Sequence, residues 1–263
     1  MNYLSKFKPC YAQLDGEMVF IRPMKKEDIS AVAQMYADVA ITDQNYKSKL
    51  SPQSEQSFGK TGGMFIVNDQ SYLEKLLESD MELMLVAQSK DQEISGFIWY
   101  SLDKNNMNGF SSLKFKPGYE NYEEILRSNF LNDSLVFGKE IIVTKEKAIK
   151  QLPVLLFYVM LLFLNKLKYT VSTGEVYSLK GYEDSSGAYT TDMLNIRSYK
   201  TLVNSGGVHI GELEPQKIRV QSFLAEVVSH IFMWDITTSI TNMQQYLKDS
   251  RIEIKNEQGR DGI

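Results

Sequence analysis

The stretch that decides the fold runs from Ser134 to Leu179. It reads SLVFGKEIIV over Ser134–Val143, LPVLLFYVMLLFL over Leu152–Leu164 and YTVSTGEVYSL over Tyr169–Leu179. The first and third pieces are rich in β-branched and aromatic residues, which predicts two strands. The middle piece is apolar over more residues than a strand usually has, which predicts a buried helix over 152–166. A strand, a helix and a second strand in this order fit a mixed sheet with helices packed on it.

Two details of this stretch bear on its geometry. Gly138 interrupts the first strand and makes a β-bulge plausible there. The apolar piece is shorter than the ~18–20 residues of a membrane span, so a core helix is expected and no membrane contact. Because that helix is apolar on every side, it needs cover on both faces. The cover comes either from the C-terminal segment or from a second subunit, which leaves a homodimer open.

The rest of the chain supplies further elements on both sides of this unit. Alternating apolar residues, polar turns and helical spacing predict their type. Strands are expected at 18–24, 83–88, 94–102, 208–213 and 217–224, and helices at 29–40, 71–77, 195–204 and 225–247. The order predicts an α/β (α+β) fold, with a mixed, mostly antiparallel central sheet and helices on both faces. We expect an N-terminal extension over 1–17, one domain over 18–224 and a C-terminal helical extension over 225–263 packed on it.

Composition excludes several classes of protein. The 263 residues are 43% hydrophobic and 24% charged, as in a folded globular chain. A single cysteine, Cys10, excludes a disulfide framework and a thiolate metal cluster. With only His209 and His230, no metal site is expected, and both histidines are assigned structural roles. The net charge of −4 argues against a nucleic-acid partner. Residues 1–13 lack an apolar leader core, so a cytoplasmic protein is expected.

Several local patterns resemble the GCN5-related N-acetyltransferases. The stretch FIRPMKKEDISAVAQMY, from Phe20 to Tyr36, looks like the opening strand and first helix of that family. The hairpin LMLVAQSKDQEISGFIWY, over 83–100, is similar to its second and third strands. Asn195-Ile-Arg-Ser198, followed by Gly206-Gly207, resembles its N-x-x-S…G-F helix. The resemblance covers 18–224 and implies acyl transfer from acetyl-CoA or another acyl-CoA, as co-substrate, to a small-molecule or peptide amine, without a metal.

The resemblance also implies where acyl-CoA lies. Its pantetheine arm would add to the edge of strand 135–143, and its pyrophosphate would lie at the start of helix 152–166. The residues implied in binding are Ile141, Ile142, Val143, Thr144, Lys147, Lys150, Gln151, Asn195 and Ser198. The chain departs from the family at the phosphate loop, because Ala148-Ile-Lys-Gln151-Leu-Pro153 has neither of the expected glycines. Lys147 and Lys150 either compensate by charge or form a solvated helix entrance.

Two residues are candidates for proton transfer. Glu140, on the strand before the helix, is the candidate base, or else an ordinary outward-facing strand residue. The tyrosine that the family carries on its N-x-x-S helix falls at Leu202 here, which cannot donate a proton. Tyr199, one turn earlier, is the substitute candidate for the acid, or else a packing residue.

Other functions stay open beside acyl transfer from acyl-CoA. The altered phosphate loop and the missing helix tyrosine also fit a non-catalytic relative that binds a ligand or partner. An acyltransferase supplied by an acyl-carrier protein would need less of the nucleotide pocket. Phe58-Gly-Lys-Thr61 has the ending of a phosphate-binding loop but lacks the preceding strand and the first glycine, so no nucleotide site is expected there.

Overall fold

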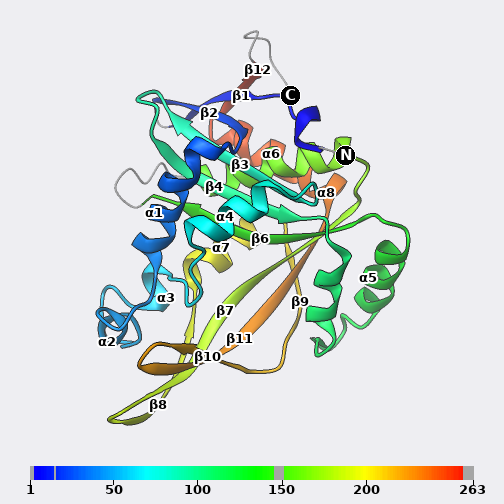
Figure 1. Cartoon of the computed structure of the whole chain (residues 1–263). Coiled ribbons are helices and arrows are strands. Elements are labelled where there is room, and N and C mark those ends of the chain that lie inside the picture. The colour runs from blue at the N-terminus through cyan, green and yellow to red at the C-terminus, as the bar shows by residue number, and fades with distance from the viewer. Residues whose placement is uncertain (1–2, 15, 145–150, 257–263) are drawn as a thin grey trace.

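The strand–helix–strand unit predicted at 134–179 is present and lies in the middle of the sheet. In the computed structural model, which describes residues 3–14, 16–144 and 151–256, β6 spans Leu135–Val143, α6 spans Leu152–Lys166 and β7 spans Val171–Asp184 (Figure 1). β6 and β7 are parallel, but they pair only over 135–137 and 171–173. Beyond these residues the two strands diverge, because β6 continues beside β4 whereas β7 follows β11.

The described strands form one mixed sheet, which is antiparallel except for the short β6–β7 pairing. Its main path is β12-β1-β2-β3-β4-β6-β7-β11-β9-β5, with β8 beside β7 and β10 beside β11. The other strands are β1 Cys10–Leu14, β2 Glu17–Pro23, β3 Glu82–Ser89, β4 Ile94–Ser101, β5 Lys114–Phe115, β8 Gly187–Leu194, β9 Val208–Glu212, β10 Gln216–Val220, β11 Phe223–Asp235 and β12 Glu253–Asn256. The predicted fold class is confirmed.

Helices cover both faces of this sheet, as predicted. The α-helices besides α6 are α1 Ile29–Val39, α2 Tyr46–Lys49, α3 Phe58–Thr61, α4 Gln70–Leu77, α5 Asn121–Leu131, α7 Ile196–Asn204 and α8 Ile236–Asp249. In Figure 1, α1 and α4 lie in front of the sheet, and α6 and α8 lie behind it. None of the described helices is both long and apolar enough to cross a membrane. The residues of α6 are mostly buried, and the helix packs between the sheet and α8.

A β-bulge in β6 changes which face its side chains occupy. Trp99 of β4 pairs with Glu140, whereas the next residue, Tyr100, pairs with Gly138, so Lys139 is the extra residue. Before the bulge, Val136 faces the core of α6. After it, Ile142, which has the same parity in sequence, packs instead in the core of α1 and α4. The bulge expected near Gly138 is thus present, and it turns Glu140 toward the α1–α4 face.

The prediction of a helix over 225–247 was wrong in its first half. Residues 223–235 form β11, which pairs with β7 along most of its length and with β9 and β10 on its other side. The helix begins only at Ile236, where Asp235 caps it by accepting a hydrogen bond from the Thr238 amide. β11 therefore crosses position 224, where a domain boundary was expected. The strand is buried on both faces, so its apolar residues do not alternate.

The cover over α6 comes from two sources. Met243 and Leu247 of α8 are buried in the same core as α6. From the sheet side, the Phe157 and Trp234 rings lie 4.9 Å apart between centroids. At the far edge, β12 pairs with β1, so the N-terminal residues 10–14 belong to the sheet. Strands β1 and β8 were not predicted, because their residues lack an apolar run.

The close approach of β6 and β7 predicts the effect of a small substitution at Gly138. A Cβ atom there would lie 2.8 Å from the Thr173 carbonyl oxygen and 3.1 Å from the Tyr100 ring. Gly138→Ala should therefore lower the free energy of unfolding by about 1–3 kcal/mol, measured by urea denaturation. Gly109→Ala is the control, since a Cβ there meets nothing within 4 Å. Equal stability of the two variants would contradict the tight contact.

Candidate active site

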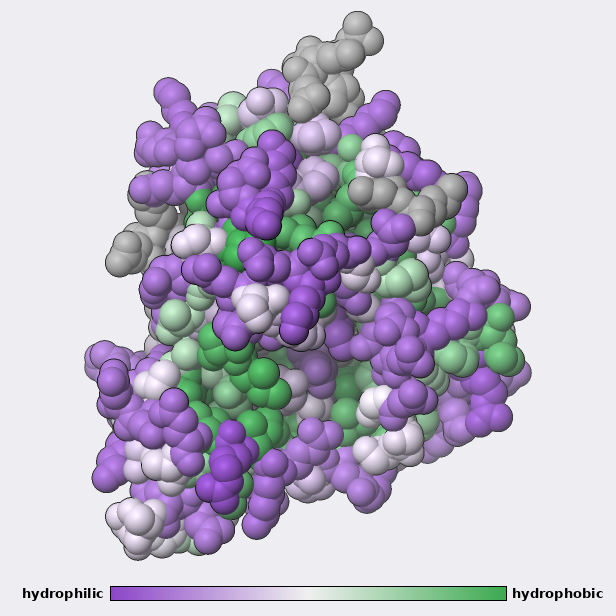
Figure 2. All heavy atoms as spheres, in the orientation of Figure 1, coloured by the Kyte–Doolittle hydropathy of each residue, from purple (hydrophilic) through white to green (hydrophobic). Residues whose placement is uncertain are grey.

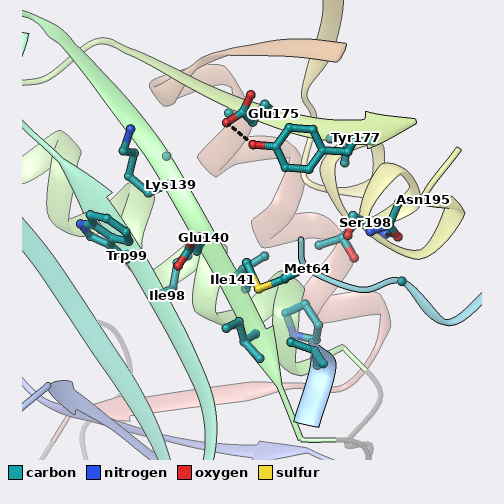
Figure 3. Close-up of a pocket in the computed structure, with 18 of the residues that line it drawn as sticks. Met64, Ile98, Trp99, Lys139, Glu140, Ile141, Glu175, Tyr177, Asn195 and Ser198 are labelled. Atoms are coloured by element: carbon teal, nitrogen blue, oxygen red, sulfur yellow. Dashed lines mark hydrogen bonds between the residues drawn. The ribbon is translucent and has the colours of Figure 1, made fainter. Parts of the chain in front are cut away.

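A cavity of about 380 Å³ lies where β6 and β7 diverge. Most of its lining comes from the end of β6, the middle of β7, residues 61–68 and the first two turns of α7, with further residues from β4 and α6. Figure 3 shows Glu140 and Ile141 on the β6 side, and Glu175 and Tyr177 on the β7 side. In Figure 2 the front face is hollowed near its middle, and hydrophobic side chains gather along one side of the hollow. The divergence of the two strands thus creates this cavity.

The edge of β6 that faces this cavity is open. One edge of the strand pairs with β4 up to Val143, whereas the β7 side is paired only up to Phe137. Among the described residues, no strand pairs with the β7-facing edge beyond that point, so its backbone groups are available to an extended ligand. Three of the residues predicted to bind acyl-CoA, Ile141, Ile142 and Val143, line the cavity. Thr144 is not among the lining residues, and its amide donates to the Ser95 carbonyl oxygen at 3.0 Å.

Glu140 is the central ionisable group of the cavity. The Asn68 side-chain amide lies 3.3 and 3.2 Å from its two carboxylate oxygens. The same amide lies 3.0 Å from the hydroxyl of Tyr36 on α1, whose ring is fully buried between α1 and the sheet. Burial, reinforced by the nearby charge of Glu175, raises the pKa of Glu140 to about 8. A carboxyl group with this pKa can both accept and release a proton near neutral pH.

Two residues of β7 face Glu140 across the cavity. The Tyr177 hydroxyl donates a hydrogen bond of 3.0 Å to the Glu175 carboxylate (Figure 3). Burial and the charge of Glu175 raise the pKa of Tyr177, so its hydroxyl stays protonated. The cavity therefore holds two carboxyl groups and one protonated phenol. Neither Glu175 nor Tyr177 was among the residues predicted from the sequence, although the predicted strand 169–179 contained both.

The start of α7 closes one side of the cavity. Asn195 caps this helix by accepting a hydrogen bond from the Ser198 amide at 3.1 Å, and both residues line the cavity. The backbone N–H of Asn195 in turn donates to the backbone carbonyl oxygen of Tyr177 at 3.1 Å, which fixes α7 to β7. The capped N-terminus thus presents its first turn to the cleft.

The remaining predicted site residues lie elsewhere. The Tyr199 ring packs against Phe232, with centroids 5.4 Å apart, and Tyr199 is not among the residues that line the cavity. Gln151, in a left-handed conformation just before α6, also lies outside the lining. Lys147 and Lys150 fall outside the described residues. Leu202 does line the cavity, at the position where the family resemblance places a tyrosine.

The raised pKa of Glu140 predicts a pH dependence of stability. The carboxyl has an ordinary value of 4.5 and a value of about 8 in the folded protein, so between these limits the folded state binds more protons than the unfolded state. The free energy of unfolding should therefore fall as the pH rises from 4.5 to 8. Across this range the free energy of unfolding of wild type should fall by on the order of a few kcal/mol relative to that of Glu140→Gln. Urea denaturation at each pH measures both.

The matched control for that experiment is Glu124→Gln, which replaces an exposed carboxylate on α5. Its stability should follow wild type at every pH. Parallel stability curves for wild type and Glu140→Gln would show that the Glu140 carboxyl is not perturbed.

Comparison with known proteins gives matches among solved structures. No family model matches the sequence, and no curated protein does. RimJ from Mycobacterium smegmatis, in complex with CoA-disulfide, is 10% identical, with 91% of this chain and 94% of that chain covered and a TM-score of 0.51. An uncharacterized protein from Bacillus halodurans is 9% identical, with 93% and 99% covered and a TM-score of 0.50. The GNAT domain of S. lividans PAT is 9% identical, with 84% and 96% covered and a TM-score of 0.46. At these identities the likeness concerns the fold, and the chain has the fold of the GCN5-related N-acetyltransferases.

Proposed function

We propose that the protein transfers an acetyl or other acyl group from acyl-CoA to the amine of an acceptor. The observation that carries the proposal is the position of Glu140, whose carboxyl has a pKa of about 8 and lines the cavity beside the open edge of β6. An acyl transfer to an amine needs such a base, because the acceptor ammonium must lose a proton before it can attack.

The open edge of β6 suits the pantetheine arm of acyl-CoA. Amide groups of that arm can pair with the backbone around Ile141–Val143 as an added strand would. The start of α6 suits the pyrophosphate less well, since Pro153 has no N–H and its neighbours Leu152 and Val154 supply the amides of the first turn. Lys147 and Lys150 are proposed to add charge there. When bound, acyl-CoA supplies the activated thioester carbonyl.

Glu140 is proposed as the general base. A cationic acceptor beside it favours the ionised carboxylate, which then takes the ammonium proton directly or through a water. The hydrogen bonds from Asn68 hold the carboxylate in place and leave lone pairs for this proton. As the C–N bond forms, the C–S bond of the thioester breaks and leaves a thiolate that needs a proton.

Tyr177 is better placed than Tyr199 to provide that proton. Its hydroxyl carries a hydrogen at neutral pH and its side chain lines the cavity, whereas Tyr199 packs against Phe232. Glu175, which accepts the hydrogen bond from Tyr177, stabilises the orientation of the phenol. We therefore propose Tyr177 as the acid and assign Tyr199 a packing role.

The two carboxyl groups of the cavity favour a cationic acceptor. Glu140 and Glu175 lie close enough for their charges to interact, and an ammonium group between them would relieve that repulsion. The aromatic rings of Tyr72 and Trp99 also line the cavity and can contact a cation. The acceptor is proposed to be a small molecule or a peptide, and the location cytoplasmic.

Two other functions remain candidates because the phosphate site is altered. A non-catalytic binding protein and an acyltransferase supplied by an acyl-carrier protein both need less from the start of α6, where Pro153 stands. Calorimetric titration with acetyl-CoA separates them from our proposal. We expect saturable binding, with Lys147→Ala/Lys150→Ala weakening acetyl-CoA more than a pantetheine fragment without phosphate. Absence of acetyl-CoA binding would favour the other two functions.

Turnover tests the roles of the side chains. An acceptor is first found by screening polyamines, amino acids, aminoglycosides and peptides with acetyl-CoA. Glu140→Gln and Tyr177→Phe should each lower kcat by on the order of 10²–10⁴, with acetyl-CoA binding retained. Tyr199→Phe is the control and should keep kcat within a few fold of wild type. Full activity of Glu140→Gln would exclude it as the base, and a greater loss in Tyr199→Phe than in Tyr177→Phe would reverse the assignment of the acid.

A further inference from the structure

A second cluster of ionisable side chains lies on the outer part of the sheet, at β9 and β11. It contains both histidines of the chain, His209 and His230, together with Glu212. One ring nitrogen of each histidine and one carboxylate oxygen lie within 4.8 Å of one another. None of the three lines the cavity between β6 and β7. The proposed acyl transfer therefore leaves this cluster without a role.

A β-bulge brings the three side chains together. His209 and Glu212 are three residues apart and would point to opposite faces of a regular strand. In β9, however, Gly211 pairs with Ile231 and His209 pairs with Phe232, so Ile210 is an extra residue. The bulge turns His209 and Glu212 to the same face, and His230 of β11 pairs directly with Glu212. This geometry needs a specific local distortion, which bulges often supply where side chains must be re-aimed.

The nitrogen atoms of both rings have partners that suit metal ligands. Nε2 of His209 lies 3.1 Å from the Gly211 carbonyl oxygen, which accepts its hydrogen and leaves Nδ1 as the atom with a free lone pair. Nε2 of His230 lies 2.9 Å from the Ser178 hydroxyl. Histidines that bind metals usually have their second nitrogen held by an oxygen in this way. Burial lowers the pKa of both imidazoles.

The distances agree with a small tetrahedral site. Nδ1 of His230 is buried and lies 3.1 Å from the nearer Glu212 carboxylate oxygen. Two ligands at ~2.0–2.1 Å from a tetrahedral zinc ion lie roughly 3.3 Å apart. The Glu212 side chain is 49% exposed, so it can rotate to close the longer separations within the cluster. Two imidazoles and one carboxylate are a donor set that Zn²⁺ and similar ions accept.

From these observations we infer that His209, Glu212 and His230 form a binding site for a divalent transition-metal ion, of which Zn²⁺ is the best match. Three protein ligands leave a fourth position for water or another ligand. The ion would join β9 to β11. The ion would also lie near α7, because the ring of Tyr199 on that helix packs against the His209 ring at 6.3 Å between centroids. The sequence alone favoured structural roles for both histidines.

Two alternative roles for the cluster fit its geometry less well. Ser178, His230 and Glu212 have the order of a nucleophile, a base and an acid, but Ser178 is 1% exposed and no substrate can reach its hydroxyl. A Ca²⁺ or Mg²⁺ site is opposed by the donor set, because these ions take oxygen ligands and two of the three donors here are imidazole nitrogens. Nitrogen donors favour a transition metal.

The test is metal titration of the full chain without a histidine tag, after treatment with EDTA. We expect one equivalent of Zn²⁺ to bind and Co²⁺ to give the absorption bands of a four-coordinate site. Because the chain has only two histidines, imidazole NMR spectra contain two ring systems, and Zn²⁺ should shift both. Glu212→Gln should weaken Zn²⁺ by at least about tenfold and should remove any rise in Tm that the ion causes.

Glu214→Gln is the matched control, since Glu214 is an exposed carboxylate two residues away that pairs with Lys114. It should bind Zn²⁺ as wild type does. His209→Gln provides a second variant, with folding of each checked by circular dichroism. Absence of stoichiometric binding, a shift of only one imidazole, or unchanged affinity in Glu212→Gln and His209→Gln would overturn the inference. None of these outcomes depends on acyl transfer, so the two proposals can fail separately.

Discussion

The short parallel pairing of β6 with β7 is the constraint on which the rest of the structure depends. The two strands approach so closely at Gly138 that a side chain there would collide with the Thr173 carbonyl oxygen. They then separate, because each strand continues beside a different antiparallel neighbour. An open strand edge and a cavity result at the same place, without any loop insertion. The sheet itself thus provides both a surface for an extended ligand and a cleft for its reactive end.

Bulges at two places decide which residues can act together. In β6 the extra residue Lys139 turns Glu140 away from the α6 core, and in β9 the extra residue Ile210 brings His209 beside Glu212. Alternation along a strand is the rule by which a sequence predicts the face of each side chain. One inserted residue reverses that rule for everything that follows. Gly138 indicates the bulge in β6 from the sequence. The bulge in β9 lies beside Gly211, and a glycine at that position is equally compatible with a regular strand.

Local signals predicted much of the fold but only part of the site. The strand at 134–143, the helix at 152–166 and the Asn195 cap follow from composition and spacing, and the structure confirms each. β11 was mistaken for a helix because a central strand buried on both faces loses its alternation. Its apolar residues also recur at intervals of four, as at Phe223, Val227 and Ile231, which fits a helix equally well.

The missed site residues depend on contacts between distant parts of the chain. Asn68 lies in a polar segment 72 residues before Glu140, and no pattern around it indicates that the two side chains meet. Glu175 and Tyr177 lie on a strand that was predicted. That they face Glu140 across a cavity follows only from the place where β6 and β7 separate. The perturbed pKa of Glu140 arises from the same packing, so it could not be inferred from the residue type.

The position of β11 in the sheet has a consequence for synthesis on the ribosome. β7 is complete by residue 184, yet its long antiparallel partner is not made until residues 223–235 emerge. During that interval one edge of β7, with its unpaired backbone groups, is a template for pairing with other chains. Strand pairings between distant residues also fold slowly, and β12 joins β1 across nearly the whole sequence. Until β11 has been made, this edge of β7 is therefore a place where the nascent chain can aggregate.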